Sequence, residues 1–343
     1  MHSADMKICS RCLLDSRFPG IKFNRDNLCS ECVKFERMWG RQINEPGYLE
    51  KTRLKLKKIL MNSKKSRNKF DCAIAASGGL DSLRIIDLIK SEYGLNPLVV
   101  TVDNAFLNPQ AKNNLSKVVS QLGIERVYCN PDIPKSLYRN FLLKTGVFCN
   151  VCVYRILINV AKIAYENNIK LVVFGMSKRQ DAFLPYGTNV FTFLSLKDKS
   201  LSLLLFYVFF GKVINLPDYV EWDTAKIRKD LEKKYSITLG EEHSDCLMHD
   251  FAKWLVYKRY GFSQVTLKYC QLIRNHRITR SRAQEEVNKI EGQEPKDLEY
   301  FLKYFDVRQE DIDSSIKNAK KLDARLVNRV GQFMRQLYFQ VKI

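Results

Sequence analysis

Short apolar runs alternate with amphipathic stretches between residues 70 and 175. The apolar runs predict strands at 70–76, 97–103, 126–130 and 171–174, and the spacing of apolar residues predicts helices at 83–89, 109–122, 134–144 and 153–168. Continuous apolar strands joined by helices are typical of a parallel sheet with both faces covered. We therefore predict an α/β fold with a doubly wound parallel sheet, whose ligands gather at the carboxyl ends of the strands.

A glycine loop follows the first predicted strand. Residues 77–82 read Ser-Gly-Gly-Leu-Asp-Ser. Paired glycines let the backbone approach an anion closely, and the N–H groups of a helix N-terminus favour negative charge. Ser77 and Ser82 add hydroxyl donors, and Asp81 could hold Mg²⁺ against phosphates. The pattern lacks the spacing and the lysine of the Walker loop, so it indicates another kind of phosphate site, with a plain strand-to-helix turn as the alternative.

Four cysteines near the N-terminus have the spacing of a metal site. Cys9, Cys12, Cys29 and Cys32 form Cys-x2-Cys-x16-Cys-x2-Cys. Each pair presents two thiolates from one turn, and the spacing closes a tetrahedral site that usually binds zinc. A segment of this length has too little core to fold alone, so the metal would supply its stability. We predict a structural zinc ribbon, with an iron–sulfur cluster as the alternative.

A second cysteine group lies further along the chain. Cys149 and Cys152 begin the helix before the last predicted strand, near the sheet edge where a nucleotide would bind, and Cys246 could join them. A helix N-terminus lowers the pKa of a thiol and favours the thiolate. Three thiolates with one open position suit an iron–sulfur cluster (4Fe–4S) or an open metal site. A reduced pair that only packs, or that resolves oxidation, is the other interpretation.

The charge balance narrows the class of partners. Lys and Arg number 57 against 37 Asp and Glu, which gives a net charge of +20. Such an excess favours polyanions: RNA, nucleotide sugars, acidic protein surfaces or an anionic membrane face. Ten cysteines without an export signal argue against a disulfide framework. The most apolar stretch, residues 201–210, is too short to span a bilayer, so we expect a cytoplasmic protein without a transmembrane segment.

We expect the chain to have four parts. These are a four-cysteine zinc ribbon (1–40), a basic helical linker (41–69), a nucleotide-binding α/β domain (70–220) and a helical C-terminal region (221–343). Helical periodicity in the last part covers 224–235, 249–260, 263–275, 279–290, 295–305 and 309–334.

The Ser77–Ser82 loop resembles the PP-loop of the ATP pyrophosphatases, which have an adenine nucleotide α-hydrolase-like fold. Together with three further stretches, it makes the chain similar to the N-acetyl sugar amidotransferases of O-antigen and flagellin-glycan synthesis. The other stretches are Cys9–Ser16 with Pro19-Gly20-Ile21, then Phe148–Cys152, and His243-Ser244-Asp245-Cys246. A tail similar to that of the family follows, with Tyr260-Gly261-Phe262, Ile273-Arg274, Ile278-Thr279-Arg280 and Ala283.

The resemblance implies a reaction and its residues. ATP would adenylate the acetamido oxygen of a nucleotide-linked N-acetyl sugar, and ammonia would displace AMP to leave an acetamidino group. By resemblance, Ser77, Gly78, Gly79, Asp81 and Ser82 bind pyrophosphate, Asp103 lies near the adenosine, Gly175 belongs to the nucleotide site, and Asp181 binds Mg²⁺. The catalytic set expected on this basis is Asp81, Asp181, Cys149, Cys152 and Cys246.

The source of ammonia points to a partner. The sequence contains no Gly-x-Cys-x-Gly nucleophile motif and no cysteine directly behind Met1. The family resemblance therefore implies a glutamine amidotransferase (glutaminase) subunit with a synthase-like companion. The apolar segment 190–216 is a candidate docking surface for such a partner.

A tRNA thiolation enzyme is the alternative. Such enzymes also combine a PP-loop, a cysteine ribbon, a central Cys-x-x-Cys with a distant third cysteine, and a basic surface. Their chemistry is parallel, with sulfur attacking the adenylated carbon in place of nitrogen. The net charge and the Cys149, Cys152 and Cys246 set favour this RNA-binding alternative, whereas the 260–283 tail favours the amidotransferase.

Overall fold

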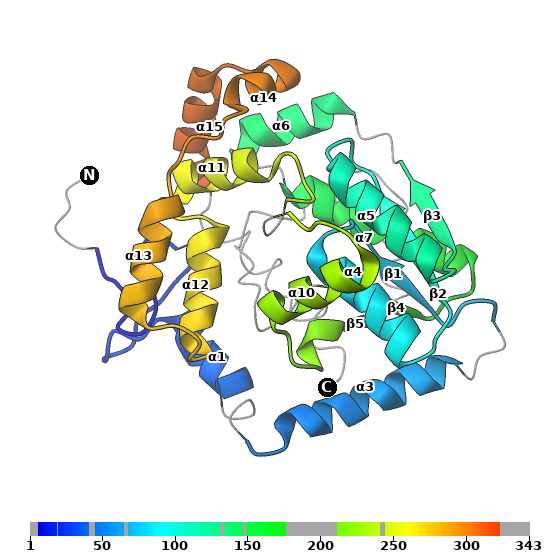
Figure 1. Cartoon of the computed structure of the whole chain (residues 1–343). Helices are drawn as coiled ribbons and strands as arrows, with labels where there is room; N and C mark the ends of the chain where they lie inside the picture. The colour runs from blue at the N-terminus through cyan, green and yellow to red at the C-terminus, as the bar shows by residue number, and fades with distance from the viewer. Residues whose placement is uncertain are drawn as a thin grey trace.

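A five-stranded parallel sheet in the order β3-β2-β1-β4-β5 occupies the middle of the chain (Figure 1). Its strands are β1 (Cys72–Ala75), β2 (Pro97–Val102), β3 (Arg126–Cys129), β4 (Leu171–Phe174) and β5 (Lys212–Asn215). The chain runs outward from β1 to β3 and then continues on the other side of β1. The direction of winding therefore reverses between β1 and β4, and ligands of open α/β sheets bind in the crevice at such a switch point.

The structure is a computed structural model. It describes residues 6–18, 20–40, 45–64, 68–130, 134–146, 149–175, 211–240 and 244–322.

Helices cover both faces of the sheet. One face packs against α3 (Tyr48–Lys64), α4 (Leu80–Asp87), α5 (Pro109–Gln121) and α10 (Thr224–Tyr235), and the other against α7 (Cys149–Glu166). Successive strand residues divide between the two faces, as the pleat requires: Ile74, Val99 and Val173 lie in the first cluster, and Ala73, Val100 and Val172 in the second. The predicted doubly wound parallel sheet is confirmed.

The remaining elements are helical. They are α1 (Ser30–Phe35), η2 (Glu36–Gly40), η3 (Leu88–Glu92), α6 (Lys135–Thr145), η4 (Leu216–Asp218), α11 (His249–Tyr260), α12 (Gln264–Arg274), α13 (Arg280–Ile290), α14 (Leu298–Phe305) and α15 (Gln309–Leu322). Side-chain caps fix several of the starts. Asp223, Ser263 and Thr279 each accept a hydrogen bond from a backbone N–H in the first turn of α10, α12 and α13. The helical C-terminal region is confirmed over the described residues up to 322, and the rest of the helix predicted at 309–334 lies outside them. None of the described helices has the length and apolar character that a membrane crossing needs.

The C-terminal helices contribute to two further cores. Helices α11 to α13 pack with the N-terminal cysteine segment, and α6, α14 and α15 gather around an aromatic cluster. In that cluster Phe106, from the loop after β2, contacts the rings of Tyr138, Phe301 and Tyr304. A loop at the edge of the sheet is thereby tied to the helical region.

Strand β5 was not predicted from the sequence. Residues 212–215 fell inside the apolar segment 190–216 that we considered for partner docking, and they pair in parallel with β4 from Leu171↔Lys212 to Phe174↔Asn215. This end of the segment therefore extends the sheet. Residues 176–210 lie outside the described part of the chain.

Helix α3 is basic on its outside and buried on one side. Leu56 and Leu60 are fully buried in the cluster that contains β1 and α4, whereas Leu54 is 62% exposed. The helix thus adds to the core on one face of the sheet. The division of the chain into four parts stays a prediction.

Replacing Leu60 tests this role of α3. We expect Leu60→Ala to lower the free energy of unfolding by about 2–5 kcal/mol, because it removes a fully buried side chain from a packed core. The matched control Leu54→Ala changes the same residue type on the exposed side and should shift it by no more than about 0.5 kcal/mol. Urea unfolding followed by circular dichroism measures both. If both substitutions lowered the free energy of unfolding by the same small amount, α3 would connect its neighbours without contributing to the core.

Candidate functional site

The glycine loop connects β1 to α4 at the carboxyl edge of the central strand. Gly79 caps α4 in an extended conformation. The Gly78 N–H donates to Ser82 Oγ at 3.0 Å, and the Gly79 N–H donates to Ser77 Oγ at 3.4 Å. Ser82 Oγ in turn donates to the Gly79 carbonyl at 2.9 Å. The two predicted serines therefore hold the loop around the start of the helix.

Two independent constraints require glycine at position 78. Its φ of +89° lies in the left-handed region, where a side chain is strained. A Cβ at this position would also overlap the backbone oxygen of Ala111 in the first turn of α5. The loop is thus pressed against a second helix, and no other residue type fits there without displacing it.

Two other segments approach the loop closely. A Cβ on Gly79 would lie 3.1 Å from Cγ of Asp245, and a Cβ on Gly175 would lie 3.2 Å from Cβ of Asp81. Gly175 directly follows β4, so the predicted residues from β1 and β4 do meet at the switch point. Asp245 comes from the segment that precedes α11. Sequence reasoning noted this aspartate only as a neighbour of Cys246.

Asp81 is exposed in the first turn of α4, and a hydrogen bond from Trp222 fixes the orientation of its carboxylate. Its Oδ1 accepts a hydrogen bond from Nε1 of Trp222 at 2.8 Å. Trp222 is 3% exposed, and its carbonyl oxygen accepts from Nη1 of Arg277 at 3.3 Å. Trp222 was not predicted, because the sequence alone does not distinguish a tryptophan that only packs in the core from one that orients a neighbouring side chain.

Asp103 follows β2 and is already paired. Its Oδ2 accepts from Nζ of Lys112 at 2.5 Å and from the hydroxyl of Tyr128, and its Oδ1 accepts from the N–H of Ala105 at 2.9 Å. Burial raises the pKa of this carboxyl, but the hydrogen bonds from Lys112 and Tyr128 outweigh it and hold the pKa below its usual range. The Asp103 carboxylate is therefore favoured in its charged form, and its hydrogen bonds hold the loop after β2 in place.

The segment before α11 crosses the loop that follows β2. The N–H of Asn108 donates to the Asp245 carbonyl at 2.8 Å, and its Nδ2 donates to the Ser244 carbonyl at 2.9 Å. The N–H of Leu247 donates to the Phe106 carbonyl at 2.8 Å. These bonds place the segment at the carboxyl edge of the sheet, beside the glycine loop.

The three distant cysteines meet in one cluster near this edge. Sγ of Cys152 is hydrogen-bonded to the Tyr138 hydroxyl at 3.3 Å and accepts from Nδ2 of Asn104 at 3.4 Å. Cys149 and Cys246 pack against the same aromatic cluster. Burial raises the pKa of all three thiols, that of Cys246 to about 12. Desolvation therefore works against the thiolate form that the helix N-terminus was expected to favour at Cys149 and Cys152.

The four N-terminal cysteines form a tighter group. Their sulfurs all lie within 4.8 Å of one another, and in the described part of the chain no other set of three or more potential metal ligands does so. The Cys9–Cys32 and Cys12–Cys29 sulfur distances are 3.9 and 3.7 Å, and backbone N–H groups of Cys12, Cys29 and Cys32 donate to the sulfurs. Four buried thiols at these distances fit a single tetrahedral metal ion. That the ion is zinc stays a prediction.

The predicted site residue Asp181 lies outside the described residues, as do Pro19, Phe148 and His243 from the stretches that carry the family resemblance. The loop residues, Asp103 and Gly175 gather at the sheet edge, and Cys149, Cys152 and Cys246 gather beside it.

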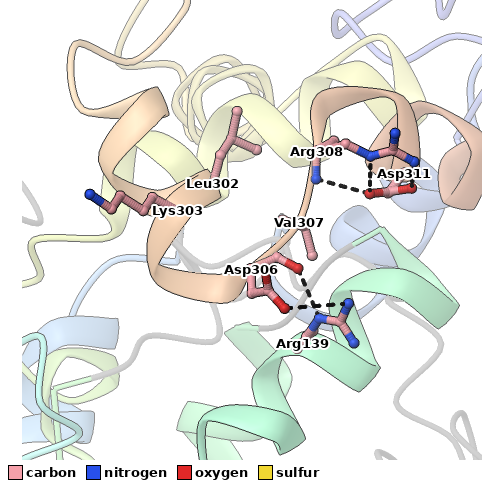
Figure 2. Close-up of a pocket in the computed structure, with 7 residues that line it drawn as sticks. All are labelled: Arg139, Leu302, Lys303, Asp306, Val307, Arg308 and Asp311. Carbon is pink, nitrogen blue, oxygen red and sulfur yellow. Dashed lines mark hydrogen bonds and ion pairs between the residues drawn. The ribbon is translucent and has the colours of Figure 1, made fainter.

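A surface pocket elsewhere contains no comparable chemistry. It lies between α6 and the α14–α15 turn, and Figure 2 shows two facing pairs of charged side chains, whereas Lys303 points away from them. Arg139 pairs with Asp306, and Arg308 with Asp311. None of the predicted site residues lines this pocket.

Replacing Gly78 tests the close approach at the loop. We expect Gly78→Ala to lower the melting temperature markedly and to abolish binding of ATP, because the new methyl group meets the backbone of α5. Gly123→Ala is the matched control: Gly123 also has a positive φ of +59°, but nothing lies within 4 Å of its Cβ position. That change should cost only about 1–2 kcal/mol of backbone strain. Differential scanning fluorimetry and calorimetry measure the two effects, and equal losses in both variants would contradict the close contact.

Part of the chain is similar to a known protein family. Residues 230–334 match the C-terminal domain of the WbpG-like LPS biosynthesis proteins. The uncharacterized protein MJ1599 of Methanocaldococcus jannaschii is 26% identical over 282 residues, which cover 82% of this chain and 93% of that protein.

Two solved structures are more distantly similar. NMN synthetase from Francisella tularensis has a TM-score of 0.40 and 13% identity, covering 70% of this chain and 92% of its own. The U34-tRNA thiolase NcsA from Methanococcus maripaludis, solved with its 4Fe–4S cluster, has a TM-score of 0.38 and 16% identity, covering 93% and 89%. The strand order of the chain itself shows the fold. Over residues 230–334 the chain is similar to the C-terminal domain of the WbpG-like LPS biosynthesis proteins, which agrees with the resemblance to a surface-polysaccharide family.

Proposed function

We propose that the chain is an ATP-dependent amidotransferase of surface-polysaccharide synthesis. It would adenylate the acetamido oxygen of a nucleotide-linked N-acetyl sugar and replace that oxygen with ammonia. The glycine loop at the switch point carries this proposal, since it joins a phosphate-binding geometry to a lipopolysaccharide biosynthesis domain within one chain.

The chemistry explains why ATP is needed. An amide carbon is a poor electrophile, and its oxygen is a poor leaving group. In the first step the acetamido oxygen bonds to the α-phosphorus of ATP, and the bond to the β-phosphate breaks to release pyrophosphate. In the second step ammonia bonds to the activated carbon, and the carbon–oxygen bond breaks to release AMP. The product is an acetamidino sugar.

The loop residues would bind the phosphates. Backbone N–H groups of Gly78 and Gly79 and the hydroxyls of Ser77 and Ser82 lie at the positive end of α4. Magnesium, when bound, would neutralise phosphate charge. Asp81 is the carboxylate we assign to it, and Asp245, which lies against Gly79, is a second candidate ligand beside the predicted Asp181.

Ammonia would reach the site from another protein. We infer a glutaminase partner with a synthase-like companion, as the family resemblance implies, since the sequence contains no Gly-x-Cys-x-Gly nucleophile motif.

A tRNA thiolation enzyme is the second candidate, and one observation favours it. Cys149, Cys152 and Cys246 pack against the same aromatic cluster, which includes Phe106 from the loop after β2. Three sulfur ligands would suit an iron–sulfur cluster that delivers sulfur to an adenylated base. Binding of RNA with a steep dependence on salt would support this alternative.

A product assay tests the proposed function. Purified protein with ATP, ammonium and a panel of nucleotide-linked N-acetyl sugars should form AMP and pyrophosphate. AMP formation should require both sugar and ammonium, and mass spectrometry should show the exchange of an oxygen atom for NH in the sugar. AMP formation with tRNA and a sulfur donor, and with none of the sugars, would reject the amidotransferase in favour of the alternative.

Replacing Asp81 tests the nucleotide site itself. Asp81→Asn keeps an oxygen that can accept from Trp222 but removes the charge. We expect pyrophosphate release to fall by about 100-fold or more, with little change in melting temperature, because a preorganised charge at the phosphates is lost. Asp230→Asn makes the same change at an exposed position on α10 and should leave the rate unaltered. Full turnover in Asp81→Asn would place the nucleotide elsewhere.

A further inference from the structure

We propose that Arg274 is the charge-balancing partner of the four-cysteine metal site, and that metal binding thereby fastens the N-terminal ribbon to α12. The ribbon is defined here as the described residues between 6 and 40. Arg274 is the last residue of α12 and lies within the WbpG-like domain.

The guanidinium of Arg274 touches both halves of the cysteine group. Its Nε donates to Sγ of Cys32 at 3.2 Å, and its Nη2 donates to Sγ of Cys12 at 3.4 Å. One sulfur belongs to each Cys-x-x-Cys pair. Arg274 is only 2% exposed, and all four cysteines are fully buried. A single side chain more than 240 residues away in sequence therefore spans the two halves of the site.

The charge of a loaded site explains why a cation belongs there. Four thiolates carry twice the charge of a divalent ion, so the site as a whole is negative. Burying such a charge is costly unless an opposite charge is near, and a buried arginine has the same need. The planar fork of the guanidinium donates to both sulfurs at once, which a single ammonium group cannot do in the same geometry.

The ribbon and the helical region also share one apolar core. Leu14 and Phe18 of the ribbon pack with residues of α11 to α13, and the rings of Phe18 and Phe262 stack with centroids 5.6 Å apart. The N–H of Leu13 donates to Sγ of Cys270 in α12 at 3.3 Å. Arg274 therefore lies within a continuous apolar interface between the ribbon and helices α11 to α13.

Metal binding and docking are linked by this geometry. If contact with Arg274 strengthens the hold of the site on its metal, then metal must strengthen the contact by the same factor. Removal of the metal should loosen the ribbon from α12. This linkage needs no nucleotide and does not rest on the proposed reaction.

The test uses the full-length, zinc-loaded protein and the variant Arg274→Met, which keeps the stem of the side chain and removes its charge. Competition with a chromophoric chelator should show zinc affinity lowered by about 10- to 100-fold, the range typical when a neighbour of metal ligands is lost. Arg280→Met is the matched control, since Nε of Arg280 donates to the backbone oxygen of Cys12 and not to a sulfur. Its zinc affinity should stay within about twofold of wild type.

A second measurement reads the docking directly. Limited trypsin digestion of the wild type should release the ribbon faster after chelation of zinc, and Arg274→Lys, which keeps the charge but loses the fork, should fall between wild type and Arg274→Met. If Arg274→Met fails to fold, the wild-type digestion and the lysine variant still decide. Equal zinc affinity in Arg274→Met and Arg280→Met, or a ribbon equally protected with and without zinc, would overturn the proposal.

Discussion

The contact of Gly78 with the first turn of α5 is the constraint on which the candidate site depends. It presses the loop after β1 against the helix that follows β2, and only a residue without a side chain allows it. Asn108, the N-cap of the same helix, holds Ser244 and Asp245 in place. One close approach therefore positions the glycine loop, the loop after β2 and the segment before α11 relative to one another. Loosening it would separate the proposed phosphate site from Asp245.

The site is shared between the sheet and the helical region. Asp81 belongs to α4, but Trp222 orients it from the segment before α10, and Arg277 contacts that segment from beyond α12. Phe106 extends the same connection into the aromatic cluster of α14. These links connect the glycine loop to the region that is similar to the WbpG-like C-terminal domain. They also make the two regions hard to exchange independently.

Local signals predicted most of the fold, and tertiary contacts account for what was missed. The period of apolar residues placed β1 to β4 and most helices, and the structure adds side-chain caps at Ser263 and Thr279 where two of the predicted helices begin. Strand β5 was missed because four residues next to an apolar stretch show no clear period. Trp222, Asp245 and Arg274 were missed because their roles come from partners more than 100 residues away in sequence. A helix N-terminus can be recognised in the sequence, whereas the desolvation that raises the pKa of Cys149 and Cys152 cannot.

The pairing of the ribbon with α12 also bears on synthesis of the protein. Cys12 and Arg274 are 262 residues apart, so the cysteines leave the ribosome long before the arginine that bridges them. During translation the N-terminal segment lacks its contact with Arg274 until most of the chain has emerged. Contacts of such long range form late and slowly. The contact between the N-terminal cysteine segment and α12 therefore forms late in folding.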